Sequence, residues 1–231
     1  DIGATAYISQ RRIFDLNGLI SPEMWPIVAI PRGLARNQAE TRLLSQVQPD
    51  YLAIFPLWHH ELTLANDVST PVHQVSTATR TMIFQQDALV YAFNAPYVRE
   101  PSPATRLDVT FGDAIKLLGF DGELGAGRLN LYWQSQQSVS QAYAVFIHVT
   151  DVEGNIVAQA DGPPVQHLAP TDLWQSGDVV FDQRQIMLPA DLPAGNYTVT
   201  AGFYLPDTFA RLPASGADAQ VDSVVLGAFE R

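Results

Sequence analysis

The stretch YAVFIHVT at residues 143–150 decides the fold class of the second half of the chain. Successive side chains of an extended strand point to opposite faces of a sheet. One face of this stretch therefore carries Tyr143, Val145, Ile147 and Val149, and the other carries Ala144, Phe146, His148 and Thr150. β-Branched and aromatic residues dominate both sets, which is typical of strands. The stretch predicts a β-strand.

Similar short segments lie on both sides of this stretch. They are RLNLYWQS, IVAQADG, VVFDQRQIML, YTVTAGFYL and VDSVVLGAFE. The residues between them are turn formers, in the order DGELGAG, DVEGN, DGPPV, QSGD and PADLPAGN. Short strands separated by such turns indicate an antiparallel β-sandwich. We predict that residues 98–231 form a sandwich of the immunoglobulin or jelly-roll type.

The first part of the chain has a different texture. RRIFDLNGL and YLAIFPLW predict strands, the second of them covered on both faces. GLARNQAETRLLSQVQ lacks proline and predicts an amphipathic helix, whose apolar positions are Leu34, Ala35, Ala39, Leu43, Leu44 and Val47. VHQVSTATRTMIFQQDALVYAF predicts further strands, with a turn near Gln86 and Asp87. We therefore expect a small α/β, partly Rossmann-like module with a parallel or mixed sheet at residues 1–97, and an α+β chain overall.

Three prolines mark the change between the two modules. Pro96, Pro101 and Pro103 lie close together with polar neighbours. Proline removes a backbone donor and favours an extended backbone. We expect an extended connector at about residues 95–106.

Composition excludes several functions. The chain of 231 residues has 13 basic and 24 acidic residues and a net charge of −11, and Lys116 is its one lysine. Since no basic cluster can neutralise phosphates, we expect no nucleic-acid partner. The chain has no cysteine, so disulfides and cysteine-based zinc sites are excluded. Neither a dinucleotide fingerprint nor a phosphate-binding loop is present, and we assign no cofactor, metal or catalytic residue.

Two groups of polar residues are candidate ligand-binding positions in the first module. Asp1 and Asp15 each end a predicted strand and precede a glycine, and ligands commonly bind at such ends in open α/β sheets. His59, His60 and Glu61 follow a predicted buried strand. Adjacent side chains point in different directions and rarely bind one metal together. The alternatives are that the aspartates form turns and that the His59 group caps a loop.

Aromatic residues of the sandwich offer a possible stacking surface for a sugar. The set comprises Tyr132, Trp133, Tyr143, Trp174, Tyr197 and Tyr204. We single out Trp133 and Trp174 as candidate ligand-binding residues. The alternative is that these rings pack in the core, as aromatic rings of sandwiches often do.

Two stretches of the chain resemble a known family. DIGATAYISQRRIFDLNGLISPE, followed by QPDYLAIFP, resembles the region after the last membrane span of bacterial polytopic glycosyltransferases of the dolichyl-phosphate-mannose–protein mannosyltransferase type. The corresponding positions are Asp1, Gly3, Tyr7, Asp15, Gly18, Leu19 and Pro22. Downstream, the segments around LYWQSQQSVSQAYAVFIHVTD, LWQSGDVVFDQRQIMLPADLPAGNYTVTAGFY and VLGAFE are similar to the β-sandwich that often closes such chains.

The resemblance implies a non-catalytic, extracytoplasmic C-terminal region of a membrane glycosyltransferase. In that family the catalytic acidic residues lie in a loop among the membrane spans, and no position here matches that loop. We therefore expect the parent protein to be the enzyme, and residues upstream of Asp1 to have been removed. The implied partners are the membrane-embedded part of the parent chain and a glycan or protein acceptor. The implied location is the extracytoplasmic face of the bacterial cytoplasmic membrane.

Two other hypotheses stay open at this point. The chain could be a secreted carbohydrate-binding protein, in which case exposed, coplanar aromatic rings are expected near Trp133 or Trp174. It could also be an independent hydrolase, which needs two carboxylates, or a carboxylate and a histidine, converging in a cleft. The sequence contains no nucleophile motif that would support the hydrolase.

Overall fold

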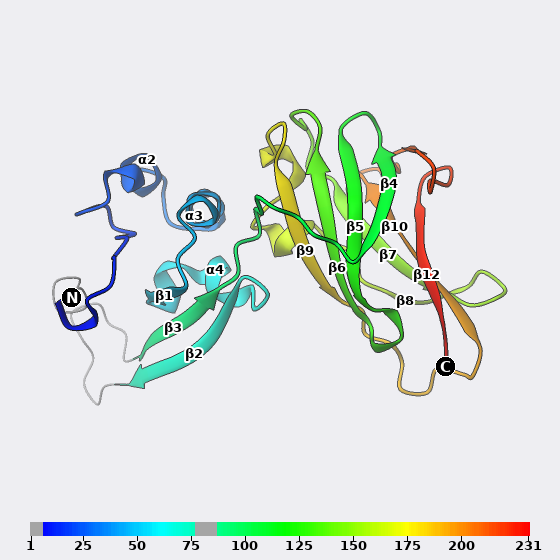
Figure 1. The fold of residues 1–231 in the computed structure, drawn as a ribbon, viewed down its shortest axis with the longest axis horizontal. Helices are drawn as coiled ribbons and strands as arrows, with labels where there is room; N and C mark the ends of the chain where they lie inside the picture. The colour runs from blue at the N-terminus through cyan, green and yellow to red at the C-terminus, as the bar shows by residue number, and fades with distance from the viewer. Residues whose placement is uncertain (1–6, 77–86) are drawn as a thin grey trace. The chain divides into compact units, whose positions relative to one another are not determined.

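The structure is a computed structural model that describes residues 7–76 and 87–231. The chain divides into two compact units, Asp1–Ala95 and Pro96–Arg231 (Figure 1). The sequence placed the boundary after residue 97. Pro96 and Val98 join the second unit because they pair with β9 (Val179–Gln185): Phe181 N–H donates to Pro96 O, and Val98 N–H donates to Val179 O.

The first unit combines short helices with a three-stranded sheet. Its helical elements are η1 (Pro22–Met24), α2 (Trp25–Val28), α3 (Leu34–Val47), η2 (Pro56–Trp58) and α4 (His60–Leu64). Its strands are β1 (Tyr51–Ile54), β2 (Ser69–Ser76) and β3 (Asp87–Phe93), in the order β1-β3-β2. β3 lies between β1 and β2 and pairs with both of them in antiparallel register. The expected parallel or mixed sheet is therefore wrong for the described strands, and a Rossmann-like module is not confirmed.

Two strand predictions in this unit need correction. Residues 11–19, the predicted strand RRIFDLNGL, form an irregular segment and a turn. In YLAIFPLW the strand β1 stops at Ile54, and the following prolyl segment forms η2. Exposed and buried residues alternate along β1, so one face of this strand is covered and not both.

Helix α3 is confirmed, but the face it buries is not the predicted one. The buried residues of α3 are Arg36, Asn37, Glu40, Thr41, Leu44 and Ser45. Of the apolar positions predicted to face the core, Leu44 alone is buried, and Leu34 and Ala35 are exposed. The helix ends where Gln48 adopts a left-handed conformation, with its N–H bonded to Leu44 O. Buried polar groups need hydrogen-bond partners, so α3 must be held by specific polar contacts.

The second unit contains two antiparallel sheets. The strands of the first sheet lie in the order β12 (Val224–Glu230), β10 (Asn196–Tyr204), β7 (Ala144–Thr150) and β8 (Ile156–Gln159). Those of the second lie in the order β11 (Ala214–Ser215), β4 (Thr105–Phe111), β5 (Ile115–Glu123), β6 (Arg128–Ser135) and β9. The 3₁₀ turns η3 (Leu124–Ala126), η4 (Pro164–His167) and η5 (Thr171–Leu173) connect some of these strands. Each predicted segment contains a strand, and the antiparallel β-rich fold is confirmed.

Aromatic rings join the two sheets into a sandwich. Phe203 of β10 lies 4.7 Å from Trp133 of β6 and 5.6 Å from Phe111 of β4, measured between ring centroids. Both contacts are edge-to-face, the arrangement that ring quadrupoles favour. Val145 and Ile147 of the opening stretch point into this core and are fully buried. The alternation in YAVFIHVT thus predicted the strand and the residues that share each of its faces.

None of the helices in the described residues is long and apolar enough to cross a membrane.

Candidate functional site

The loop after Asp15 is a tightly bonded turn, and Asp1 lies outside the described residues. Asp15 is buried, its Oδ1 accepts the N–H of Asn17 at 2.9 Å and its Oδ2 accepts the N–H of Leu19 at 2.6 Å. Gly18, with φ of 77°, allows the chain to turn, and its carbonyl accepts Nε1–H of Trp25 at 2.8 Å. Since both carboxylate oxygens are occupied by backbone, Asp15 organises the loop, and the turn alternative holds.

This loop, residues 15–25 and here called the Asp15 loop, exposes apolar side chains. Leu19 is 80% exposed, Ile20 is 58% exposed and Trp25 is 67% exposed. A Cβ atom at position 18 would lie only 3.0 Å from Cδ1 of Trp25, so glycine also lets the indole lie against the loop backbone. The Asp15 loop therefore exposes three large apolar side chains, of which the Trp25 indole is held by the Gly18 carbonyl.

His59 belongs to a buried polar network centred on Glu40. Nδ1 of His59 lies 2.8 Å from Oε2 of Glu40, while Nε of Arg36 donates to Oε1 at 2.9 Å. Asn37 donates to the same carboxylate at 2.9 Å and accepts the N–H of Glu61 at 3.1 Å. We call Arg36, Asn37, Glu40 and His59 the Glu40 network. It binds α3 to the start of α4.

The two neighbours of His59 do not join it in a site. His60 is exposed and Glu61 is half-buried, and Glu61 contributes its backbone N–H to the Glu40 network. Among residues 7–76 and 87–231, no three histidine or acidic side chains lie close enough together to hold a metal ion. The WHHEL segment therefore joins two helices through His59, and the described residues bring no acid and base together in an open cleft there.

Trp133 and Trp174 are core residues. Trp133 is fully buried between the sheets, and its Nε1–H points to Oδ2 of Asp182 at 3.4 Å. Trp174 is also buried and donates to Ala169 O at 2.8 Å. Neither ring can stack on a sugar without unfolding the core. The core alternative holds for both.

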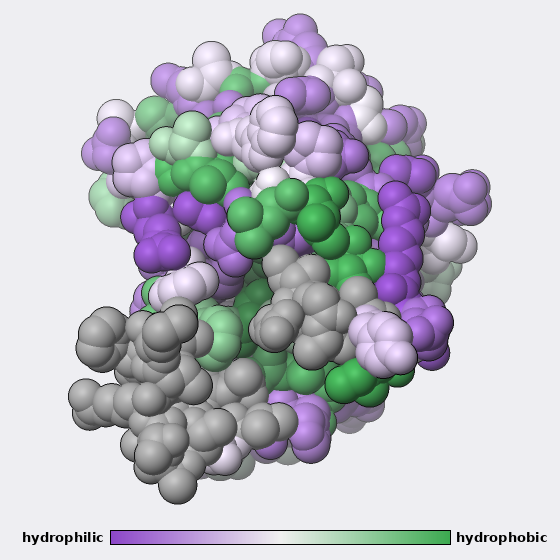
Figure 2. Space-filling view, turned by 90° about the vertical axis from the view of Figure 1, so that its left-hand side faces the viewer, coloured by the Kyte–Doolittle hydropathy of each residue, from purple (hydrophilic) through white to green (hydrophobic). Residues whose placement is uncertain are grey.

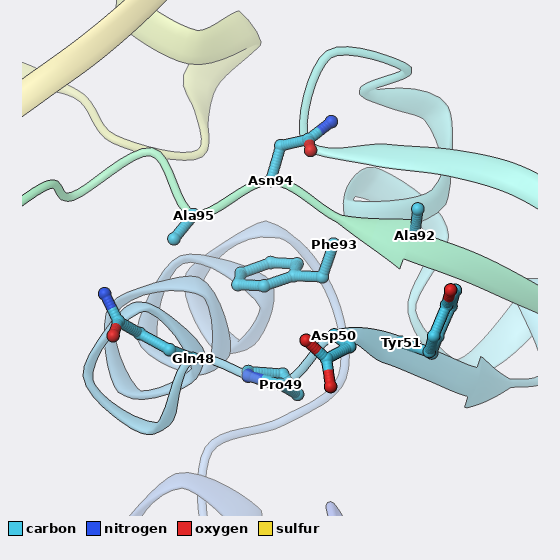
Figure 3. Close-up of a pocket in the computed structure, with 8 residues that line it drawn as sticks. All are labelled: Gln48, Pro49, Asp50, Tyr51, Ala92, Phe93, Asn94 and Ala95. Atoms are coloured by element: carbon cyan, nitrogen blue, oxygen red, sulfur yellow. The ribbon is translucent and has the colours of Figure 1, made fainter.

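A shallow pocket of about 390 Å³ opens in the first unit. Its lining comes from the end of α3, the start of β1 and the end of β3, and comprises Gln48, Pro49, Asp50, Tyr51, Ala92, Phe93, Asn94 and Ala95 (Figure 3). The carboxylate of Asp50 is the one charged group among these side chains. A single carboxylate without a histidine or second acid offers no acid–base pair.

The outer face of the sheet β12-β10-β7-β8 carries a cluster of aromatic and charged side chains. The register pairs Phe146 with Gly202 and Ala144 with Tyr204, so Phe146 and Tyr204 share the face opposite the core. The ring of Phe209, in the loop after β10, lies 6.0 Å from that of Tyr204 and nearly parallel to it, at 10°. We call the cluster of Phe146, His148, Asp161, Tyr204, Phe209 and Arg211 the outer-face cluster.

Charged groups surround these rings. The guanidinium of Arg211 lies 4.2 Å from the centre of the Phe146 ring. Nε2 of His148 lies 3.6 Å from Oδ2 of Asp161, whose Oδ1 accepts the N–H of Ile147 at 3.1 Å. Burial raises the pKa of the Tyr204 phenol, and the negative charge of Asp161 raises it further. Tyr204 is therefore a neutral hydrogen-bonding group beside a carboxylate.

Sequence patterns identified part of this cluster. Tyr204 stood in the aromatic set, and His148 and Phe146 were placed together on one face of residues 143–150. Phe209 and Arg211 did not stand out in the sequence, and Asp161 stood there only as a residue of the turn segment DGPPV. The sheet register, which places residues 146, 148 and 204 on one face of the sheet, is the signal that connects the cluster.

Comparison with known proteins adds a family match without an activity. Residues 1–101 match the model of a domain of unknown function, DUF8728. No curated protein matches the chain. The matched region includes the Asp15 loop and the Glu40 network and ends before β4. The functional argument therefore rests on the geometry of the two units.

Proposed function

We propose that this chain is a non-catalytic, extracytoplasmic region of a bacterial membrane glycosyltransferase, and that its first unit docks on the membrane-embedded part of the parent protein. The observation that carries the proposal is the Asp15 loop. Its buried carboxylate orders the loop backbone, Gly18 O binds the Trp25 indole, and Leu19, Ile20 and Trp25 are exposed. Ordered apolar side chains gathered at a surface mark an interaction site.

The rest of the first unit supports docking. Its exposed large apolar side chains among the described residues are Tyr7, Ile8, Leu19, Ile20, Trp25, Leu34, Tyr51, Leu57, Leu64 and Val72. In Figure 2 hydrophobic side chains lie near the centre of the face it presents, with polar side chains above and to the right of them. In α3 five of the six buried residues are polar, while Leu34 and Ala35 are exposed, unlike an ordinary surface helix. An apolar partner would cover such a surface.

The apolar surface of the first unit and the acidic charge of the chain together favour one kind of docking partner. The net charge of −11 disfavours an anionic lipid surface as the direct partner. A protein surface continuous with membrane spans supplies apolar contacts without anionic head groups. In this role the first unit anchors the chain, and the second unit contacts glycan or protein acceptors.

Fractionation of the source cells tests this function. An antibody against the chain should detect a product much larger than 25.3 kDa that stays with membranes after alkaline carbonate washing. A product of about the chain's own mass, released by the wash or found in the aqueous fraction, would overturn the proposal.

A further inference from the structure

The loop after β10 places an aromatic ring in solvent at a conformational cost. Phe209 is 76% exposed and has a φ of 58°, a left-handed conformation that is strained for a non-glycine residue. Its N–H donates to Leu205 O at 2.8 Å, which fixes the residue on the loop. Asparagine or glycine would take this conformation with less strain and without exposing an apolar ring. The ring stacks on Tyr204 and still leaves most of its surface in solvent, open to contact with a ligand.

The strand beside it carries a buried aromatic ring, since Phe146 is only 2% exposed. Gly202 has no side chain, and a Cβ atom there would lie 2.5 Å from the ring of Phe146. The Phe146 ring therefore lies over β10, with the Arg211 guanidinium above it. Tyr204 and Arg211 face each other across a β-bridge. This arrangement puts Arg211 next to the parallel rings of Tyr204 and Phe209.

Hydrogen-bonding groups lie at the edge of the rings. The side chain of Asp161 is 25% exposed, and its Oδ2 lies beyond hydrogen-bond distance from His148, at 3.6 Å. A carboxylate can accept up to about four hydrogen bonds, so Asp161 keeps acceptor capacity towards solvent. Arg211 lies 3.5 Å from Asp222 through one nitrogen and has further donors. The cluster thus combines the exposed ring of Phe209 with charged donors and acceptors.

We propose that the outer-face cluster binds a neutral sugar ring of a glycan. A pyranose has an apolar face of C–H groups, which packs on aromatic rings, and a rim of hydroxyls, which bond to carboxylates and guanidinium groups. The carboxylates of Asp161 and Asp222 disfavour an acidic sugar. This inference deepens the proposed function, since it names the ligand of the second unit, but it requires residues of that unit alone.

Binding is measured on the isolated chain by NMR. Neutral tetrasaccharides of glucose, mannose and galactose are titrated to about 10 mM into the ¹⁵N-labelled protein, because an open surface with few contacts gives millimolar affinity. We expect at least one of them to shift the amide signals of residues 144–148, 200–204 and 209–211. Phe209→Ala should weaken binding at least about tenfold, as the loss of a stacked ring does. Asp161→Asn should weaken it several-fold.

Tyr51→Ala is the matched control, since Tyr51 is an exposed aromatic residue of the first unit that lines the pocket of Figure 3. It should bind like the parent sequence. The proposal is overturned if no tetrasaccharide shifts these signals, if Phe209→Ala binds unchanged, or if Tyr51→Ala abolishes binding. These results are independent of cell fractionation, so failure of sugar binding and failure of membrane attachment are separate outcomes.

Discussion

Oε2 of Glu40 lies 2.8 Å from Nδ1 of His59, and this contact links α3 to α4 across 19 residues of sequence. The same carboxylate pairs with Arg36, and all three side chains are buried. Glu40→Ala should therefore leave the Arg36 guanidinium buried without a counter-charge and destabilise the first unit by about 3–5 kcal/mol. Hydrogen exchange of peptides covering α3 and α4, at increasing urea, measures this loss separately from the second unit.

Glu23→Ala is the control for the Glu40 network. Glu23 is exposed in η1, so its removal should change stability by no more than about 0.5 kcal/mol. Equal protection of α3 in the Glu40→Ala protein and the parent sequence would show that the network does not hold the unit together.

Asp182 is a buried carboxylate of the second unit that, like Glu40 in the first, pairs with an arginine. It is fully buried, accepts the N–H of Val165 at 2.9 Å and pairs with Arg184 at 2.8 Å. Three successive left-handed residues, 165–167, follow that bond. Asp182→Ala should destabilise the second unit by about 3–5 kcal/mol and release this loop. Amide hydrogen exchange of β6 and β9 at increasing urea measures this loss of stability. Asp207→Ala, at an exposed position, is the control.

The raised pKa of Tyr132 predicts that the second unit loses stability in alkali. Burial, and then the hydrogen bond to and charge of Asp121, raise the pKa of Tyr132 to about 12. Between pH about 10 and about 12 the folded state holds a proton that the unfolded state has released, so stability should fall as pH rises through this range. Tyr132→Phe should flatten that fall. Urea midpoints on either side of pH 10 measure it, and a slope unchanged by the substitution would contradict the assignment.

Gly202 should tolerate no larger residue. Gly202→Ala would bring a methyl group within 2.5 Å of the Phe146 ring and 2.8 Å of Asp222 O, and should cost about 1–3 kcal/mol by overpacking. Gly195→Ala is the matched control, because a Cβ atom there has nothing within 4 Å. Thermal unfolding of the two variants measures the difference. A melting temperature for Gly202→Ala equal to that of Gly195→Ala would show that Phe146 moves aside freely.

The sandwich could be predicted from the sequence because its signal is local. Alternation placed Val145, Ile147 and Val149 on one face, and all three are fully buried. The same rule places Trp133 on the face of Leu129 and Leu131, so its burial was available from RLNLYWQS. Periodicity therefore predicted these strands and which residues share a face.

The buried polar groups could not be predicted in this way. Hydrophobic periodicity assigned Leu34 and Ala39 of α3 to the core, but Glu40 is buried because His59 reaches it from a distant segment. Such pairing depends on tertiary contacts between residues far apart in sequence. The exposure of Phe209 likewise depends on the turn after β10 and its positive φ, which no local pattern specifies.

Cysteine labelling tests docking of the first unit most directly, because the chain has no cysteine of its own. Leu19→Cys and the control Val152→Cys both replace side chains that are 80% exposed. Each is introduced into the isolated chain and into the full-length protein in membranes, and its rate of reaction with a water-soluble maleimide is measured. We expect both variants to react fast in the isolated chain, and the Leu19→Cys variant alone to be protected in membranes. Equal reaction of Leu19→Cys in the two settings would contradict docking through the Asp15 loop.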